Sequence, residues 1–302
     1  MSDAMLVFDR RAVRLHRDRA APNFAHHDFL MREAAERLAE RLADCRREFA
    51  CALDLGCHGG LLAPMLGRQV ARLVQSDLSA AMLRRARGAR VVADEELLPF
   101  APASFDLVLS GMSLHWVNDL PGALLQIRQV LKPDGLFLGC MAGGATLAEL
   151  RQALIEAEAE IENGASLRVS PFADLQSLAG LLQRAGFALP VADQETITVT
   201  YPDALALMRE LRGMGETHAA HARRKGLSRR ATLARAAERY ATRFTEADGR
   251  IRATFQLLFM TGWHPHESQP RPLRPGSAST KLADALGAEE KSAGEKAGPG
   301  GA

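Results

Sequence analysis

The amino-acid sequence predicts an α/β fold, in which helices cover both faces of a central, mostly parallel sheet. The first observation is the stretch from Cys51 to Gly60, where a short apolar run ends at an acid and a glycine-rich turn follows. The second is a series of further apolar runs that alternate with segments whose apolar residues recur at helical spacing. The third is a pair of runs, 195–201 and 250–259, whose composition predicts an antiparallel final strand.

The glycine-rich turn after the first strand is the predicted ligand-binding element. It reads Asp54-Leu-Gly-Cys-His-Gly-Gly60, and Gly56 and Gly60 lack the Cβ that would keep a ligand away from the backbone. Apolar residues between 61 and 66 predict a helix directly after the turn, with its positive end directed at the ligand. Strand, turn and helix in this order build nucleotide sites. The spacing D-x-G-x-x-x-G differs from the dinucleotide fingerprint G-x-G-x-x-G.

Acidic residues end the next two predicted strands. The strand at 72–76 leads to Asp77, which lies 23 residues after Asp54. An acid in this place can accept both hydroxyls of a ribose, because a charged acceptor binds a diol through two strong hydrogen bonds. The alternative is that Asp77 only caps the following helix. The strand at 90–93 leads to Asp94 and Glu95.

The fourth predicted strand, 105–110, opens onto the same edge of the sheet. It is apolar on both faces, as parallel strands are, and it ends at Ser110. His115 and Trp116 follow where residues that face an acceptor substrate are expected. His115 is a candidate general base, and the alternative is a ring that is hydrogen-bonded at the sheet edge. Trp116 either faces the substrate or packs in the interior.

The remaining segments surround this centre. Residues 1–45 form a predicted helical cap, with helices at 8–19 and 29–43 separated by Pro22. The main domain is predicted to span 46–262, with further helices at 120–131, 146–162 and 172–186, and a strand after the turn Lys132-Pro-Asp-Gly135.

A helical insertion at about 203–247 is predicted to precede the last strand. Its helices, 203–214 and 228–242, would form a lid or a partner surface over the pocket. The insertion carries a basic cluster whose alternative interpretation is a solvated helix face: Arg223, Arg224, Lys225, Arg229 and Arg230. Beyond it, 263–286 is predicted to be a proline-rich extended tail and 287–302 to be disordered.

Composition restricts the class of protein. The net charge is +2 with basic and acidic residues interleaved, so we expect no nucleic-acid partner. No apolar run approaches the ~20 residues that a membrane span needs, and we expect no membrane insertion. The four cysteines have no metal-type or secreted spacing, which favours a cytoplasmic location. We expect no metal site, because His264, His266 and Glu267 are poorly spaced for one.

These motifs resemble, in order, those of the class I S-adenosylmethionine-dependent methyltransferases over about residues 50–142. The resemblance implies a Rossmann-like, seven-stranded sheet and the cofactor S-adenosyl-L-methionine. It also implies that an acid after the third strand accepts the adenine amino group. The implied cofactor contacts are Asp54, Gly56, His58, Gly60, Asp77, Leu78, Asp94, Glu95 and Ser110. The chain departs from the family at His58, where members usually have glycine, and this side chain either fits beside the cofactor or narrows its site.

Nearly the whole chain up to about residue 286 resembles one subgroup, the methyltransferase-type assembly factors of respiratory complex I. The segments that carry this are 8–21, 114–122 and 262–270, with Arg274-Pro-Gly-Ser-Ala278. The resemblance implies a protein substrate, the iron–sulfur subunit of complex I, modified by methylation or arginine hydroxylation. Residues 114–116 also resemble the malonyl carrier-protein O-methyltransferases, which is the alternative function. The third hypothesis is a non-catalytic assembly chaperone whose His58 obstructs the cofactor.

Overall fold

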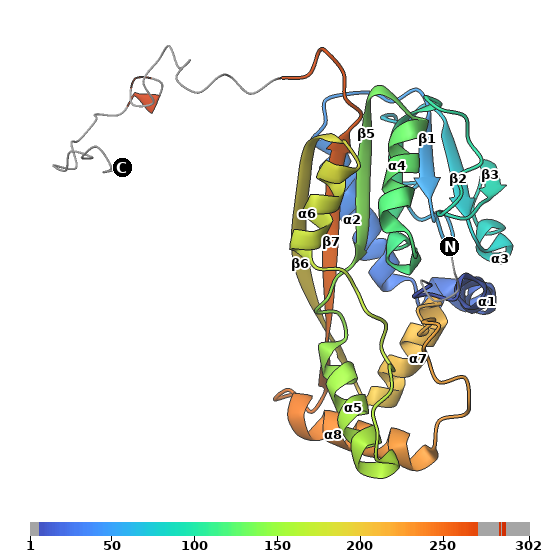
Figure 1. Ribbon diagram of the computed structural model, residues 1–302, viewed down its shortest axis with the longest axis vertical. Helices are drawn as coiled ribbons and strands as arrows, with labels where there is room; N and C mark the ends of the chain where they lie inside the picture. Colours follow the sequence, from blue (N-terminus) through green and yellow to red (C-terminus); the bar gives the residue numbers. More distant parts are fainter. Residues whose placement is uncertain (1–5, 271–283, 285, 288–302) are drawn as a thin grey trace, which may run out of the picture. The chain divides into compact units, whose positions relative to one another are not determined.

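A seven-stranded sheet forms the centre of the protein in a computed structural model, which describes residues 6–270, 284, 286 and 287 (Figure 1). The strand order is β3-β2-β1-β4-β5-β7-β6. The strands are β1 (Ala52–Leu55), β2 (Leu73–Asp77), β3 (Ala89–Val92), β4 (Phe105–Gly111), β5 (Leu131–Ala142), β6 (Ala188–Tyr201) and β7 (Ile251–Trp263). Strands β1 to β5 run parallel, whereas β7 is antiparallel to both β5 and β6. The predicted Rossmann-like sheet with an antiparallel final strand is confirmed.

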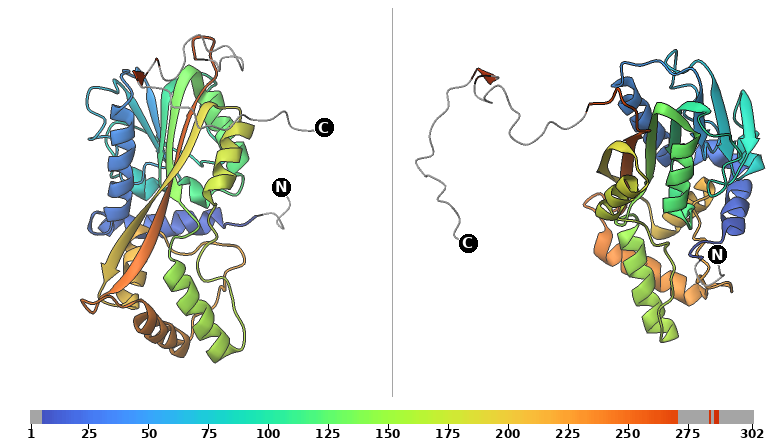
Figure 2. Two further views of the ribbon diagram at one scale, coloured as in Figure 1. Left: turned by 90° about the vertical axis from the view of Figure 1, so that its left-hand side faces the viewer. Right: turned by 45° about the horizontal axis from the view of Figure 1, so that its top comes forward.

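Helices cover both faces of the sheet, as predicted. On one face α2 (Phe29–Ala43) packs in a core that includes Ala52. On the other face α4 (Leu120–Val130) and α6 (Leu175–Arg184) pack in a core that includes Leu53. Figure 2 shows α2 and α6 on opposite sides of the strands. Successive residues of β1 therefore enter opposite cores, which is why its sequence is apolar without interruption until Asp54.

The predicted helix directly after the glycine-rich turn is wrong. Residues 61–66 form successive turns instead, with hydrogen bonds that span three residues, such as Met65 N–H to Leu62 C=O. Pro64 explains the difference, because proline has no N–H and disfavours helical backbone in the residue before it. Leu62 and Leu66 are still buried, so the apolar spacing indicated packing rather than a helix.

The N-terminal segment consists of α1 (Arg10–Ala20), the short 3-10 helix η2 (Ala21–His26) and α2. Helix α1 lies at the end of the parallel strands where β1 and β2 lead into their loops, whereas α2 covers a face of the sheet (Figure 1). Asp9 caps α1 by accepting a hydrogen bond from Ala12 N–H at 3.0 Å. Pro22 stands in the first turn of η2, where its missing N–H is tolerated, so the helical path bends there without ending.

Strands β6 and β7 continue as a two-stranded ribbon, and α5 (Ala148–Glu162), α7 (Ala204–Met214) and α8 (Arg230–Phe244) gather around it (Figure 1). The ribbon pairs Tyr201 with Ile251 at its far end. Helices α7 and α8 belong to the insertion predicted at 203–247, and α8 packs against α5. The predicted helical insertion before the last strand is therefore confirmed.

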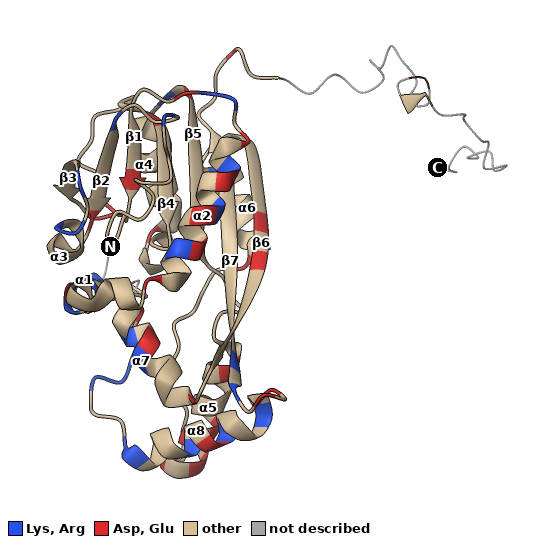
Figure 3. Cartoon of the chain, turned by 180° about the vertical axis from the view of Figure 1, so that it is seen from behind, with Lys and Arg blue, Asp and Glu red and all other residues tan. Residues whose placement is uncertain are grey.

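The basic cluster of the insertion takes part in ion pairs. Arg223 pairs with Asp9 at 2.8 Å, and Arg224 pairs with Glu162 of α5. Lys225, Arg229 and Arg230 are exposed. Figure 3 shows basic and acidic residues interleaved along the ribbons of α5 and α8. Two members of the cluster thus hold the insertion against the N-terminal segment and α5.

A second unit begins at Glu267, and the structure describes its residues 267–270, 284, 286 and 287. Most of the predicted extended tail, 263–286, and nearly all of the predicted disordered end, 287–302, lie outside the described residues. Within the described part of the chain, no helix is long and apolar enough to span a bilayer. No group of three or more His, Cys, Asp or Glu among those same residues is arranged to hold a metal ion.

Candidate functional site

The glycine-rich loop after β1 is closely packed at the edge of the sheet. Gly56 has φ +71°, and a Cβ there would lie 2.1 Å from Ser113 Oγ. Gly60 has φ +76°, and its Cβ would lie 2.5 Å from Gln75 Oε1. Both values are below any real contact distance, so only glycine permits this loop to approach its neighbours.

Asp54 lies buried at the start of this loop without any hydrogen-bond partner for either carboxylate oxygen. Burial, together with the nearby charge of Asp77, raises the pKa of Asp54 to about 8. A buried carboxylate without a donor is costly unless a ligand supplies one. The site therefore fits the ammonium group at the amino-acid end of the predicted cofactor.

Asp77 is fully buried and holds two loops together. Its carboxylate accepts hydrogen bonds from the backbone N–H of His58 at 2.9 Å and of Ser79 at 2.7 Å. The remaining side of the carboxylate faces Arg17, whose Nη1 lies 3.3 and 3.4 Å from its two oxygens. Ser79, rather than Asp77, is the N-cap of the following helix α3 (Ala80–Leu83). The place predicted for a ribose is thus occupied by a guanidinium group of the chain itself.

Arg17 and Arg10 also occupy the predicted adenine side. Arg17 Nη1 donates to Glu95 Oε1 at 3.2 Å and Nη2 donates to Ser113 Oγ at 3.1 Å, while Arg10 pairs with both Asp94 and Glu95. Burial alone would raise the pKa of Glu95, but the two guanidinium groups lower it to about 2. In this arrangement the Asp54 carboxylate offers acceptors for the amino-acid end of S-adenosyl-L-methionine, whereas α1 covers the place of its adenosine end.

Sequence reasoning missed both arginines. Positions 10 and 17 are seven residues apart and therefore share one face of α1, but this spacing alone does not show that the face is buried. Arg17 is 0% exposed, an unusual state for an arginine and one that requires buried partners. Helix α1 thus carries two charges that face inward.

His58 narrows the site from the other side. Its backbone has φ +50°, and its ring stacks on Phe24 with centroids 5.9 Å apart. Nε2 donates to the carbonyl oxygen of Met112 at 3.1 Å, while Nδ1 is buried without a partner. Burial, and then the charge of Arg17, lower the pKa of His58, so the ring is neutral. The space beside Asp54 and His58 is a cavity of about 10 Å³, room for a single water.

Two other predicted cofactor contacts have structural roles in this arrangement. Ser110 is buried, and its hydroxyl donates to the carbonyl oxygen of Leu55 at 2.9 Å, which joins the ends of β4 and β1. Leu78 packs against a small apolar cluster that contains Phe8, Val13 and Trp116. Both residues therefore shape the site without presenting a polar group to it.

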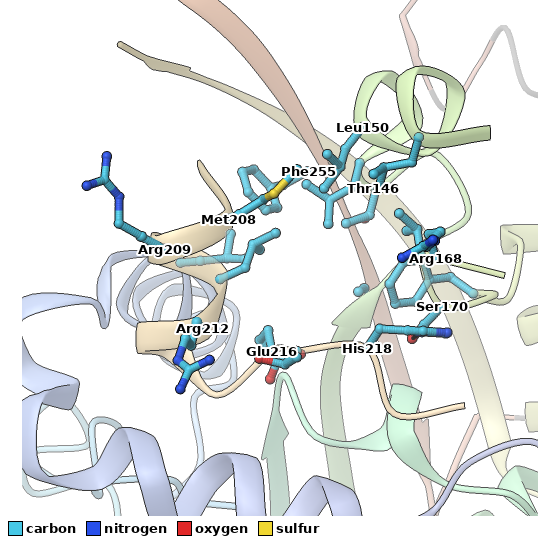
Figure 4. A pocket seen from close by; sticks show the side chains of 18 of the residues that line it. Thr146, Leu150, Arg168, Ser170, Met208, Arg209, Arg212, Glu216, His218 and Phe255 are labelled. Carbon is cyan, nitrogen blue, oxygen red and sulfur yellow. Dashed lines mark hydrogen bonds between the residues drawn. The ribbon is translucent and has the colours of Figure 1, made fainter. Parts of the chain in front are cut away.

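A second, much larger cavity of about 710 Å³ adjoins the loop after β4 (Figure 4). Its walls are mostly apolar and come from α5, α7, α8, β7 and the loop before α6. They include Leu147, Leu150, Phe172, Met208 and Phe255. Met112 lines this cavity and also accepts the hydrogen bond from His58, so the cavity and the glycine-rich loop are direct neighbours.

Glu216, just after α7, joins the two predicted acceptor-facing residues at the cavity wall. Its Oε2 accepts hydrogen bonds from His115 Nε2 and from Trp116 Nε1, both at 2.9 Å. Trp116 lines the cavity, and its ring packs edge-on against Phe8. His115 is buried and is not among the lining residues. Sequence reasoning missed Glu216, which no motif marks.

Comparisons with known proteins agree with the geometry. A family model described as "Methyltransferase domain" matches residues 53–139. The chain is 45% identical to the mitochondrial arginine-hydroxylase NDUFAF5 of Danio rerio, over 93% of this chain and 89% of the relative. It is 35% identical to the malonyl-[acyl-carrier protein] O-methyltransferase of Methylovorus sp. (strain MP688), over 87% of this chain and 92% of the relative.

Among solved structures, the YcgJ protein of Bacillus subtilis shares the fold. It is 16% identical and has a TM-score of 0.54. The match covers 77% of this chain and 98% of the YcgJ chain. The expected cytoplasmic location is contradicted by the comparisons, because the NDUFAF5 relatives from zebrafish, mouse and human are all mitochondrial proteins.

Proposed function

The chain belongs to the methyltransferase-fold family of the arginine-hydroxylase NDUFAF5, and from that premise we propose that it modifies a protein substrate during the assembly of respiratory complex I. The modification is a methylation or an arginine hydroxylation. The substrate we propose is the iron–sulfur subunit of the complex. One observation carries the proposal: the large cavity lies directly beside the glycine-rich loop, with Met112 belonging to both. A group that enters the cavity thereby comes next to the cofactor loop.

The methyltransferase domain makes S-adenosyl-L-methionine the cofactor, which supplies an electrophilic methyl group on a sulfonium when it is bound. We propose that Asp54 accepts the hydrogen bonds of its ammonium group, since both carboxylate oxygens lack a partner. Asp77 is the proposed acceptor for the ribose hydroxyls, and Asp94 and Glu95 are the proposed acceptors on the adenine side. Because Arg17 lies against Asp77 and Glu95, cofactor binding requires Arg17 to withdraw.

For His115 we propose the hydrogen-bonded alternative rather than the role of general base. Its Nε2 faces Glu216 and its Nδ1 is buried without a partner, so neither nitrogen is directed at the cavity. His115 then positions Glu216, and Trp116 contacts the substrate. In the same proposal, residues 1–45 act as a cap over the cofactor and the insertion at 203–247 acts as a lid over the substrate.

Deletion of the gene in the organism that carries it tests the proposal. Complex I content should fall and should return when the wild-type gene is reintroduced. A normal content of assembled complex I in the deletion strain would overturn the proposal. Mass spectrometry of the iron–sulfur subunit from both strains then distinguishes a mass gain of one oxygen from that of one methyl group.

An O-methyltransferase that acts on an acid bound to a carrier protein is the second candidate. The observations that favour it are the 35% identity to a malonyl-[acyl-carrier protein] O-methyltransferase and the presence of Arg209 and Arg212 among the residues that line the cavity. Methyl ester formation on malonyl-carrier protein by the purified chain would support it. Failure to relieve a biotin-synthesis defect counts against that substrate. If the wild-type chain does not bind the cofactor at all, the chaperone hypothesis gains support.

A further inference from the structure

We propose that Glu216 is the receptor for a guanidinium group at the inner end of the large cavity, and that this cavity holds an arginine side chain of the protein substrate. The inference rests on the proposed function, in which the family acts on arginine, and it identifies the residue that selects the substrate. The supporting observation is the buried carboxylate of Glu216. Its Oε2 accepts two hydrogen bonds, whereas its Oε1 has no hydrogen-bond partner.

Only one of the two carboxylate oxygens of Glu216 has hydrogen-bond partners. Its side chain is 9% exposed, and Oε2 is anchored by two donors, His115 and Trp116. Oε1 is buried and has no hydrogen-bond partner. A buried acceptor without a partner is unfavourable, and a ligand that brings a suitable donor removes this cost. Figure 4 shows the side chain of Glu216 at the cavity.

The charges around Glu216 keep it ionised. Burial alone would raise its pKa, but the neighbouring His115 and Arg17, with a smaller effect of His58, lower it below the ordinary value. An ionised carboxylate with one unpaired oxygen is the preferred partner of a guanidinium group, whose planar array of N–H donors matches carboxylate geometry.

The other charged residues of the cavity do not compete for the same ligand. Among the described residues that line it, Glu216 is the only acid. Arg168 is held by Glu158 at 2.6 Å, and the side chains of Arg209 and Arg212 point away from the centre of the cavity in Figure 4. His218 also lines the cavity. Burial lowers its pKa to about 4, so its ring is neutral at physiological pH.

The walls suit the rest of an arginine side chain. Three methylene groups carry the guanidinium, and they require apolar surroundings such as those given by Leu150, Met208 and Phe255. Trp116 and Phe172 supply aromatic rings close to Glu216, and a guanidinium group stacks favourably on such faces. The cavity thus combines apolar walls, aromatic rings and one anionic side chain.

Binding of amphiphilic probes to the full chain tests the inference. Octylguanidinium, octylammonium, octanol and octanoate share one chain and differ only in the head group. We expect octylguanidinium to bind at least tenfold more tightly than octanol, and octanoate to bind most weakly, by isothermal titration calorimetry. A preference for octanoate would overturn the inference and would assign the cavity to an acid. Equal affinity for all four probes would also overturn it.

Variants then locate the receptor. Glu216→Gln should remove the advantage of octylguanidinium over octanol while octanol still binds. Glu210→Gln is the matched control, because Glu210 lies on α7, six residues before Glu216, but pairs with His27, and neither Glu210 nor His27 lines the cavity. Glu216→Asp keeps the charge but shortens the side chain by one methylene group, so it should reduce the advantage of octylguanidinium, and it serves if Glu216→Gln does not fold. An unchanged advantage in the Glu216 variants would refute the assignment.

Complementation separates this inference from the function on which it rests. If the gene deletion lowers complex I content and Glu216→Gln restores it fully, the proposed function stands and the role of Glu216 fails. If the deletion leaves complex I normal while the probe preference depends on Glu216, the guanidinium site stands and the proposed function fails.

Discussion

Arg17 and Asp77 form a buried contact between the N-terminal helix and the end of β2, with Arg17 Nη1 3.3 Å from Asp77 Oδ2. Asp77 is the acid proposed to hold the ribose of the cofactor. The same carboxylate therefore has two mutually exclusive partners, one within the chain and one in the ligand. The contact with Arg17 stabilises the protein without cofactor, and the proposed cofactor binding requires the contact with the ribose.

Arg17→Ala should increase the affinity for S-adenosyl-L-methionine and lower the stability of the apo protein. Removal of the internal competitor should tighten binding by about tenfold, which is ~1.4 kcal/mol. Loss of one partner from a buried ion-pair network should lower the free energy of unfolding by about 3–5 kcal/mol. Calorimetry and denaturant titration measure the two effects. Arg14→Ala, on the exposed side of α1, is the control and should change neither quantity. Weaker cofactor binding by Arg17→Ala would show that α1 supports the cofactor instead.

Asp77→Asn should abolish cofactor binding. It removes the charged acceptor for the ribose and places an amide N–H near the two backbone donors, His58 N–H and Ser79 N–H. We also expect a loss of about 1–3 kcal/mol in the free energy of unfolding, because a buried donor loses its partner. Asp44→Asn, which changes an exposed acid, is the control. Binding that survives in Asp77→Asn would remove Asp77 from the cofactor site.

Asp54 should make the apo protein less stable as the pH rises. Its pKa in the folded state is about 8, above its ordinary value of 3.8, so the folded protein binds a proton that the unfolded chain releases. The stabilisation is complete below pH 4 and is lost as the pH rises through about 8. Asp54→Asn should flatten this decline in the free energy of unfolding between pH 5 and pH 9, and should weaken cofactor binding. An identical pH profile for wild type and variant would contradict the assignment.

His58→Gly should open the cofactor site. Glycine adopts a positive φ without strain, and loss of the imidazole frees the space beside Phe24 and Met112. We expect tighter binding of S-adenosyl-L-methionine, measured by calorimetry. The lost ring packing should cost about 1–3 kcal/mol of unfolding free energy. His58→Ala, which removes the ring but keeps a Cβ at positive φ, separates the two effects. If binding is equal in wild type and both variants, His58 does not obstruct the cofactor.

The sequence predicted those features that depend on local patterns. Each strand that places an acid at the site was identified from its apolar run, including β1 before Asp54 and β2 before Asp77. Helices α7 and α8 lie where the sequence predicted helices, at 203–214 and 228–242. The helix expected after the glycine-rich turn was the exception, since the spacing of Leu62 and Leu66 also suits turns that pack on the core.

The parts that could not be predicted depend on long-range contacts. Arg17 meets Glu95 across 78 residues, and Glu216 meets His115 across 101. In a single sequence such partners look like ordinary solvated charges, because nothing nearby reveals that they are buried. The position of Arg17 in the predicted adenosine site and the unpaired oxygen of Glu216 are therefore properties of the tertiary structure. Neither can be predicted from the sequence.

The ribbon of β6 and β7 has a consequence for the order in which the protein folds. Its far end pairs Tyr201 with Ile251, and α7 and α8 lie in the segment between them. Closing the loop between Tyr201 and Ile251 costs chain entropy before the strand pairing contributes any stabilisation. Such contacts therefore form slowly. The glycine-rich loop depends on pairings between segments closer in sequence, such as that of β1 with β2, whose register joins Asp54 to Gln75. We therefore expect the cofactor loop to form earlier in folding than the large cavity, which is complete only when the last strand closes the ribbon.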